Sequence, residues 1–313
     1  MEQGKQPKEI IAPIDRDLLE SELTEELFIR KTNKADNHIY ILNHHNAPNV
    51  MLEIGRLREV TFRASGGGTG EEVDIDEADT GDRYYEQLIV YNPEDREIVG
   101  GYRFITGKFA YDPDSEDFEL STAHYFEFSD QMKREYLPYS IELGRSWVQP
   151  NYQPSVNPRK GVFALMNIWD GLGSLVMRYP EVKYFLGKVT MYTHYHEEAR
   201  NVLLSFLAHY FPIRTDLCKP KPELEAGFDD TIFNQHFTED VSFKDGFKLL
   251  NKLVKEHGEW IPPLINIYMN LSTTMLTFGT ARNPDFGDVE ETGLLVTIGD
   301  IHEEIVNRHI NYE

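Results

Sequence analysis

Four groups of charged and aromatic residues follow one another along the first half of the chain. They are Arg58-Glu-Val-Thr-Phe62, the run Asp74-x-Asp76-x-x-Asp79-x-x-Asp82, Arg103 after a Gly100-Gly101 pair, and Glu142-Leu-Gly-Arg145. Clustered carboxylates attract and orient a cationic amine, and a guanidinium binds a carboxylate through two parallel hydrogen bonds. Charges within apolar strands are costly to bury alone, so we expect the set to converge on one cleft. The alternative is that these acids and arginines only pair with each other and hold the domain together.

Other motifs lack residues that their chemistry requires. No Lys-Ser/Thr follows the run Gly66–Gly70, so we interpret it as a hinge or loop and not as a phosphate loop. Asp74 begins a run like a calcium loop, but the twelfth residue is a tyrosine where glutamate is required. His194-Tyr-His196 lacks the second histidine of a zinc-protease helix, so no metal site is predicted. Cys218 has no histidine nearby in the sequence and is interpreted as an inert thiol.

The spacing of apolar residues predicts the elements that position these groups. A helix opens at Asn46 and Pro48 and ends at Ala64, before three glycines that a helix does not readily hold. Strand, helix, strand and helix then alternate, which is typical of an α/β layer with a parallel pair of strands. The expected segments are a hairpin of Tyr85–Tyr91 and Ile98–Ile105, the strands Ser140–Val148 and Tyr184–Val189, the helices Gly161–Tyr179, Glu197–Phe211 and Gly246–His257, and two last strands at Thr273–Thr280 and Gly293–Ile298.

The strand Ser140–Val148 carries two charged residues, Glu142 and Arg145. Their spacing of three places the two side chains on opposite faces of a regular strand. A β-bulge at Gly144 would turn one of them, so that both side chains reach the same face. A bulge is therefore needed if the two charges are to act together.

Composition limits the classes of protein to which the chain belongs. Of its 313 residues 40% are hydrophobic, which is enough to build a core. The net charge of −22 argues against nucleic acid or an anionic bilayer as the main partner, with at most peripheral membrane contact. The single cysteine and the lack of an apolar signal or spanning run predict a cytoplasmic protein. We expect a polar, loosely attached leader at residues 1–45 and a single domain at residues 46–313.

In this order, the four groups resemble a known family. Arg-x-x-x-Phe, Asp-x-Asp-x-x-Asp, a Gly-x-Arg strand and Glu-x-x-Arg on the next strand are similar to the acyl-carrier-dependent N-acyltransferases of the GNAT fold. The chain most resembles the ornithine-lipid or glycine-lipid N-acyltransferases, also called hemolysin-like proteins, and more distantly the acyl-homoserine-lactone synthases. The resemblance implies an α/β (α+β) fold: a mixed, splayed sheet with helices on both faces and additional C-terminal helices. In it, Ser140–Val148 and Tyr184–Val189 are adjacent and parallel, with Gly161–Tyr179 as the crossover helix.

The resemblance also implies a set of site residues. The catalytic or framing residues are Glu142, Arg145, Arg58 and Arg103, and the substrate-binding residues are Phe62, Asp74, Asp76, Asp79 and Gly144. The usual acetyl-coenzyme A loop is replaced by residues 153–161, where backbone N–H groups, Arg159, Lys160 and Gly161 are expected to hold a phosphate of the donor. Lys183 and Lys188 flank the donor strands and are expected to add to a basic patch. The Gly66–Gly70 loop replaces a Trp-containing segment of the lactone synthases, which argues against lactone synthesis.

The expected reaction is amide formation from a thioester, without a covalent enzyme intermediate or a permanent cofactor. Glu142 takes the ammonium proton if burial raises its pKa, and backbone N–H groups near Gly144 stabilise the oxyanion. The expected donor is an acyl-carrier-protein or coenzyme A thioester. The acceptor is a small amine such as glycine or ornithine, and the product is an N-acyl amino acid for lipid biosynthesis. Two alternatives stay open: a short-chain or acetyl-coenzyme A-dependent N-acetyltransferase, and an inactive acyl- or protein-binding module.

Overall fold

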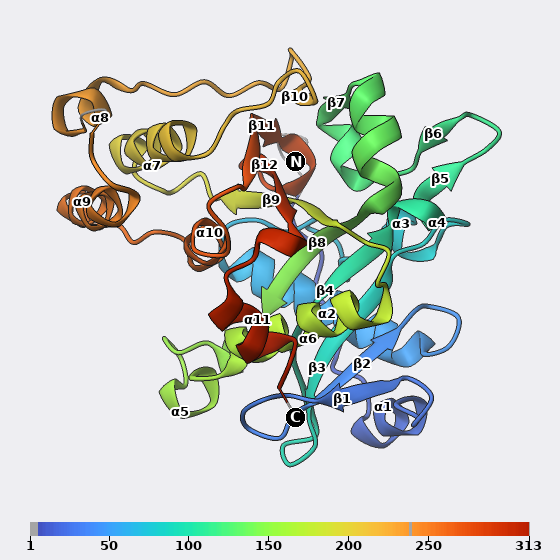
Figure 1. Ribbon diagram of the computed structural model, residues 1–313. Helices are drawn as coiled ribbons and strands as arrows, with labels where there is room; N and C mark the ends of the chain where they lie inside the picture. The colour runs from blue at the N-terminus through green and yellow to red at the C-terminus, as the bar shows by residue number, and fades with distance from the viewer. Residues whose placement is uncertain (1–5, 238–239, 313) are drawn as a thin grey trace.

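An eight-stranded sheet runs through the molecule (Figure 1). The computed structural model describes residues 6–237 and 240–312. In spatial order the strands are β1 (Phe28–Lys31), β2 (His38–Leu42), β3 (Glu86–Asn92), β4 (Glu97–Thr106), β8 (Ser140–Val148), β9 (Tyr184–Met191), β12 (Val289–Thr297) and β11 (Leu276–Asn283). Two small sheets join β5 (Tyr111–Asp112) to β6 (Asp117–Phe118) and β7 (Phe126–Phe128) to β10 (Cys218–Pro220). In the large sheet only β8 and β9 pair in parallel.

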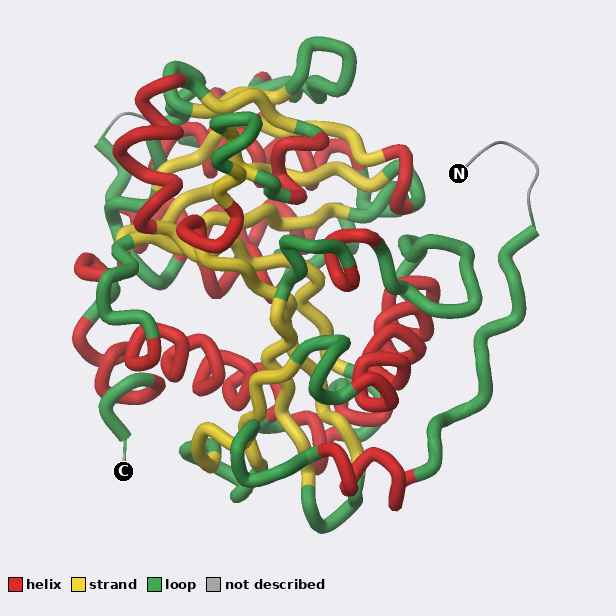
Figure 2. Tube along the Cα trace, turned by 90° about the vertical axis from the view of Figure 1, so that its right-hand side faces the viewer, coloured by secondary structure: helices red, strands yellow, loops and turns green. Residues whose placement is uncertain are grey.

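Helices cover both faces of this sheet (Figure 2), which confirms the predicted α/β arrangement. The front face is the one that carries α2 (Pro48–Ala64) and residues 107–139. The back face carries α6 (Ala164–Arg178), α7 (Glu197–Tyr210), α9 (Phe243–Glu256) and α10 (Pro263–Met269). The remaining helices are α1 (Arg16–Glu22), α3 (Glu77–Thr80), α4 (Gly107–Ala110), α5 (Pro158–Gly161), α8 (Thr231–His236) and α11 (Glu303–His309). Among the described residues, no helix is long and apolar enough to cross a bilayer.

Alternation along the strands sorts side chains between the two faces. In β4, Tyr102 and Phe104 are buried against the helices of the back face, so Arg103 between them points to the front. In β8, Leu143 packs on the back face and Glu142 lies on the front. The charged residues that the sequence singled out on these strands therefore share the front face.

The parallel pair β8–β9 separates partway along its length. Four residue pairs join the two strands, from Ser140 opposite Tyr184 to Leu143 opposite Gly187. Beyond them β8 continues to pair with β4, and β9 continues to pair with β12, so the sheet opens into two halves. This confirms the predicted adjacent, parallel and splayed pair. The crossover helix α6 begins at Ala164, after the separate short helix α5.

The prediction that residues 1–45 form a loosely attached leader is wrong for β1 and β2, which belong to the large sheet. β1 and β2 form one edge of the large sheet, and β2 pairs with β3 from His38 opposite Tyr91 to Leu42 opposite Gln87. Ile39 and Leu42 have no exposed surface. The strand β2 has only five residues and lies within a polar sequence, so composition did not indicate it. Its burial depends on pairing with β3, which comes much later in the chain. Residues 1–5 lie outside the described residues.

Candidate active site

A buried ion-pair network lies on the front face where α2 and α3 meet β4 and β8. Arg58 donates from Nε to Asp74 at 3.0 Å and from its two terminal nitrogens to the two oxygens of Asp79, each at 3.1 Å. All three side chains have no exposed surface. Burial opposes charge on Asp79, but the guanidinium groups of Arg58 and Arg103 outweigh it and hold the pKa of Asp79 well below its ordinary range. At Asp74 burial also opposes the charged form, but the guanidinium groups of Arg145 and Arg58 outweigh it and lower the pKa of Asp74.

Two further arginines complete the network. Arg103 donates to Asp76 at 2.7 Å and to Asp79 at 3.2 Å. Arg145 lies 2.9 Å from Asp74 and 3.6 Å from Asp76. Asp76 is the exposed member, with 38% of its side chain accessible, and Arg145 retains 17%. The network therefore has a buried base and a partly open edge formed by these two residues, and the predicted convergence holds for Arg58, Asp76, Asp79, Arg103 and Arg145.

Arg145 reaches the front face because β8 contains a bulge. The register between β4 and β8 shifts between Gly101 and Arg103, and Arg145 itself has a φ of +47°. The predicted bulge is therefore confirmed, one residue beyond Gly144. The guanidinium of Arg145 stacks on the ring of Phe286 at 4.2 Å. Phe62 packs edge-on against the same ring at 5.1 Å, so it supports this stack from the core.

Glu142 lies on the front face beside the network, not within it. Its carboxylate accepts hydrogen bonds from the Tyr85 hydroxyl, the Ser121 N–H at 3.0 Å, the Thr122 N–H at 2.7 Å and the Thr122 hydroxyl. Only 1% of Glu142 is exposed. The ring of Tyr85 connects it to the network, because the Arg103 guanidinium lies 5.1 Å from the ring centre. Of the charged residues predicted to converge, Glu142 is the one that stands apart.

Lys188 occupies a place that the sequence did not predict. Its Nζ lies 3.4 Å from the Thr122 hydroxyl, 3.9 Å from Glu291 Oε2 and 5.5 Å from the centre of the Tyr125 ring. It therefore points to the front face, toward Glu142, and not to a basic patch around the donor loop. Its partners come from a loop and from β12, which no local motif connects. The one available signal was the lysine inside the otherwise apolar strand Tyr184–Val189, because Glu291 lies outside the predicted strand Gly293–Ile298.

The expected donor residues lie on α5. Lys160 pairs with Asp95 at 2.7 Å, in the turn between β3 and β4. A side chain at Gly161 would meet the backbone nitrogen of Pro154 at 2.5 Å, so residues 153–154 pack directly against it. Arg159 is exposed and makes no ion pair within the part of the chain that the structure describes. It is therefore the member of this group whose charge is free for a donor.

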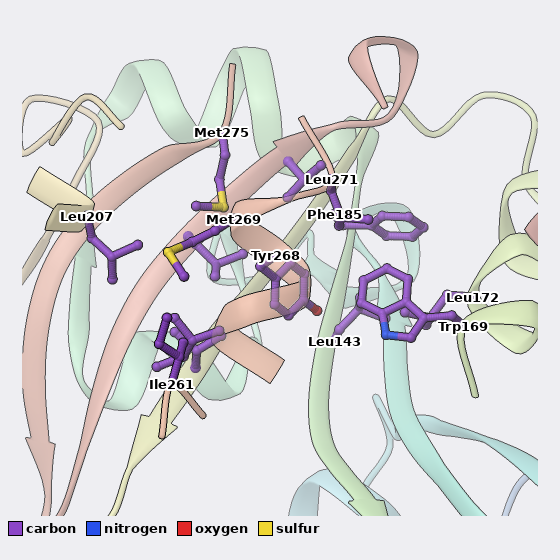
Figure 3. Packing of buried hydrophobic residues seen from close by; sticks show 14 of the residues in the cluster. Leu143, Trp169, Leu172, Phe185, Leu207, Ile261, Tyr268, Met269, Leu271 and Met275 are labelled. Atoms are coloured by element: carbon purple, nitrogen blue, oxygen red, sulfur yellow. The ribbon is translucent and has the colours of Figure 1, made fainter. Parts of the chain in front are cut away.

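Aromatic and apolar residues close the back face of the sheet near the splay (Figure 3). Trp169 of α6 and Tyr268 of α10 meet edge-to-face with ring centres 5.4 Å apart, close to Leu143 and Phe185. The indole nitrogen of Trp169 and the amide of the fully buried Asn167 have no hydrogen-bond partner among the described residues. Buried polar groups are almost always paired, so α6 carries hydrogen-bonding capacity that the folded chain leaves unused.

Two groups outside this region were also considered from the sequence. Cys218 is buried, and burial raises the pKa of its thiol, which is consistent with an inert role. His196 joins Glu198 and His257 at the start of α7, where their possible ligand atoms lie within 4.8 Å of one another. No metal-type spacing was visible in the sequence, because His257 follows the end of α9 and lies far from His196 along the chain. Acidic and histidine groups of this kind are common on surfaces without an ion.

The low pKa values of Asp74 and Asp79 predict how stability changes with pH. An unfolded aspartate takes up its proton near pH ~4, whereas these two stay ionised in the folded state to lower pH. Their contribution to stability is therefore complete above about pH 5 and is lost as the pH falls below about 4. Urea unfolding between pH 3 and 7 measures this. We expect a falling free energy of unfolding at the acid end, with a shallower fall in Asp79→Asn, and an equal slope in both proteins would contradict the assignment.

Comparison with known proteins gives the class of this protein. Residues 57–159 match the family described as the acetyltransferase (GNAT) domain, a range that includes the whole ion-pair network and Glu142. The chain is 51% identical over 303 residues to a glycine N(alpha)-acyltransferase of Bacteroides thetaiotaomicron, covering 97% of this chain and 90% of that protein. It is 49% identical over 303 residues to the protein of the same name from Phocaeicola vulgatus, covering 97% and 93%. No solved structure matches the chain significantly.

The splayed mixed sheet and the matched domain define an acyltransferase of the GNAT class. The chain belongs to the same family as the two acyltransferases from Bacteroides thetaiotaomicron and Phocaeicola vulgatus, because the similarity extends over almost its full length. The match therefore includes the elements α7 to α10, which lie outside the GNAT domain match. The resemblance to ornithine-lipid enzymes and to lactone synthases stays a prediction.

Proposed function

We propose that this protein transfers an acyl group from a thioester to the amine of glycine. The observation that carries the proposal is that both relatives, similar over 97% of the chain, are named for acylation of glycine. The charges around the splay suit such an acceptor, because a zwitterionic amino acid needs a cation for its carboxylate and an acid for its ammonium group. Arg145 and Lys188 offer cations on the front face, and acidic side chains lie beside both.

The donor we propose is a fatty acyl thioester of acyl-carrier protein or coenzyme A, and the product serves lipid biosynthesis. The splay between β8 and β9 gives a thioester a path between the two half-sheets to the front face. The back face beside it is lined with buried apolar side chains, among them Leu143, Phe185 and Met269, which favour an acyl chain over water (Figure 3). Trp169 and Asn167 offer unpaired hydrogen-bonding groups for the polar part of the donor.

Glu142 suits a positioning role better than that of a base. Its two oxygens accept five hydrogen bonds, so little acceptor capacity is left for a substrate proton. The Thr122 hydroxyl donates to Glu142 and accepts from Lys188. We therefore assign to Glu142 the positioning of residues 121–122 and, through them, of the Lys188 ammonium group.

An activity assay with purified protein tests the proposal. Hexadecanoyl-carrier protein, hexadecanoyl-coenzyme A and acetyl-coenzyme A are each offered with glycine, with ornithine and with no acceptor. We expect thiol release that depends on glycine, and N-acylglycine in the mass spectrum, with a long-chain donor. Turnover of acetyl-coenzyme A alone would support the short-chain alternative. Absence of turnover with every combination of donor and acceptor would reject the proposed function in favour of a binding module.

Charge reversal on α5 separates the two possible donors. Arg159→Glu is expected to raise the KM for the acyl-carrier protein about tenfold and to steepen the loss of activity with salt, because a free cation at an interface steers an acidic partner. Lys160→Glu is the matched comparison. Lys160 already pairs with Asp95, so this variant also breaks a contact within the fold. Equal KM values for Arg159→Glu and the unmodified protein would remove Arg159 from the donor site.

A further inference from the structure

Glu291 of β12 is a buried carboxylate with an unused oxygen. Only 6% of the residue is exposed, and Oε2 has no hydrogen-bond partner among the described residues. The nearest cation, the Lys188 ammonium group, lies 3.9 Å away, beyond hydrogen-bond distance. A buried, unpaired carboxylate oxygen is costly, so its presence indicates a group that the folded chain does not itself supply.

The position of Glu291 relates it to the splay. Lys188 directly follows Gly187, the last residue of β9 that pairs with β8. Gly293 lies opposite Lys188 and Glu291 opposite Thr190, so the side chains of Glu291 and Lys188 share the front face. Lys188 and Glu291 therefore stand on one side of the opening.

Arg145 stands on the other side of the opening. It is the second residue of β8 beyond Leu143, the last residue of that strand to pair with β9. Its guanidinium is turned to the front face by the bulge.

Charges from both sides of the opening act on Tyr125. Its pKa is raised first by burial and then by the carboxylates of Glu291 and Asp285, and it is lowered by Arg145. The Lys188 ammonium group lies 5.5 Å from the centre of the Tyr125 ring, so Tyr125 stands next to Lys188 at the opening. Its hydroxyl stays neutral, so it can donate a hydrogen bond to an anion or accept one from an amine.

We propose that Glu291, Lys188 and Tyr125 form the binding site of the amino-acid acceptor, and that Glu291 is the base that takes its proton. The inference rests on the proposed function and adds to it the residues that recognise the acceptor. The free oxygen of Glu291 receives the ammonium group, and Lys188 with Arg145 receives the carboxylate.

The chemistry balances without a further reactant. The acceptor ammonium gives one proton to Glu291 and becomes a neutral amine. Its nitrogen attacks the thioester carbonyl, so that an N–C bond forms and the C–S bond breaks. The second proton leaves the nitrogen for the departing sulfur, which is released as a thiol. Glu291 returns its proton to solvent, and the products are an amide, a thiol and one proton.

Glu291→Gln tests the role of the base. We expect kcat/KM for glycine to fall about 100-fold, and the acidic limb of the pH–rate profile to move to higher pH, because the amide cannot take a proton and only an acceptor that is already neutral then reacts. A residue with only a structural role would leave that limb in place. Glu291→Asp retains the acid and is expected to recover part of the rate with the limb restored. Glu127→Gln, in an exposed pair with Lys219, is the control and is expected to match the unmodified protein.

Lys188→Met tests recognition of the carboxylate. We expect the KM for glycine to rise about tenfold while the KM for glycinamide, which has no carboxylate, stays nearly the same. Thermal melts confirm that each variant is folded. Unchanged kinetics in Glu291→Gln, or an equal effect of Lys188→Met on both acceptors, overturns the inference while glycine acylation by the unmodified protein stands. If the unmodified protein acylates another amine, the proposed function fails. Glu291→Gln is then measured with that amine, and an unchanged rate overturns the inference as well.

Discussion

Arg58→Met is expected to lower the free energy of unfolding by about 3–5 kcal/mol. The substitution keeps most of the apolar volume and removes a guanidinium that pairs with both Asp74 and Asp79 while fully buried. Asp74 keeps Arg145 and Asp79 keeps Arg103, but each loses one of the cations that hold it ionised. A buried carboxylate with too few partners costs more than the pair contributed.

Chemical unfolding by urea, followed by circular dichroism, measures this change. Arg58→Lys retains the charge but cannot span both oxygens of Asp79, so we expect an intermediate loss. Lys248→Met removes a cation from an exposed pair on α9 and is expected to leave the unfolding midpoint unchanged. A loss in Arg58→Met no larger than that of the Lys248 control would show that the network does not stabilise the fold.

Glu142→Gln is expected to lower turnover at least tenfold and stability by about 2–3 kcal/mol. The amide replaces one carboxylate oxygen with an N–H₂ group, which then faces backbone N–H groups that also donate. Residues 121–122 lose their anchor, and the Thr122 hydroxyl no longer holds Lys188 in place. The loss is therefore expected in both kcat and the KM for glycine.

The pH–rate profile separates positioning from proton transfer at this residue. If Glu142 only positions, Glu142→Gln keeps the acidic limb of the profile at a reduced rate. A shift of that limb to higher pH in Glu142→Gln, with the limb unmoved in Glu291→Gln, would return the role of the base to Glu142. Tyr85→Phe removes one donor and puts no new donor opposite the carboxylate, so its effect is expected to be smaller.

Much of the scaffold could be predicted from local patterns. The hairpin of β3 and β4, the helix that ends at Ala64 and the crossover helix all occur where apolar spacing and turn residues indicated them. A parallel pair requires a long crossover, and helix α6 between β8 and β9 supplies one, while the expectation that these strands are neighbours came from the resemblance to the GNAT fold. The cost of burying isolated charges likewise predicted that Arg58, Asp79 and Arg103 would meet.

Other features could not be predicted from local sequence patterns, because they depend on partners that lie far along the chain. β2 is a short strand in a polar region, and it became part of the core only because β3 pairs with it. Lys160 was expected to face a phosphate, but the turn at Asp95 brings it a closer partner. Glu142 gained its partners from residues 121–122, a segment with no motif of its own.

The sequence by itself determined the order of the elements, the presence of a parallel pair of strands and the acids and arginines that had to be paired, because periodicity and the cost of buried charge act locally or on residue type alone. The splay of that pair was expected only from the resemblance to the GNAT fold. Only the tertiary structure decided which side chains face the opening between the half-sheets. Arg145 turns to the front face through a backbone conformation with φ of +47°, which its residue type does not dictate. Lys188 and Glu291 meet because β9 and β12 pair in one register, and a shift of one residue in that pairing would put the two side chains on opposite faces of the sheet.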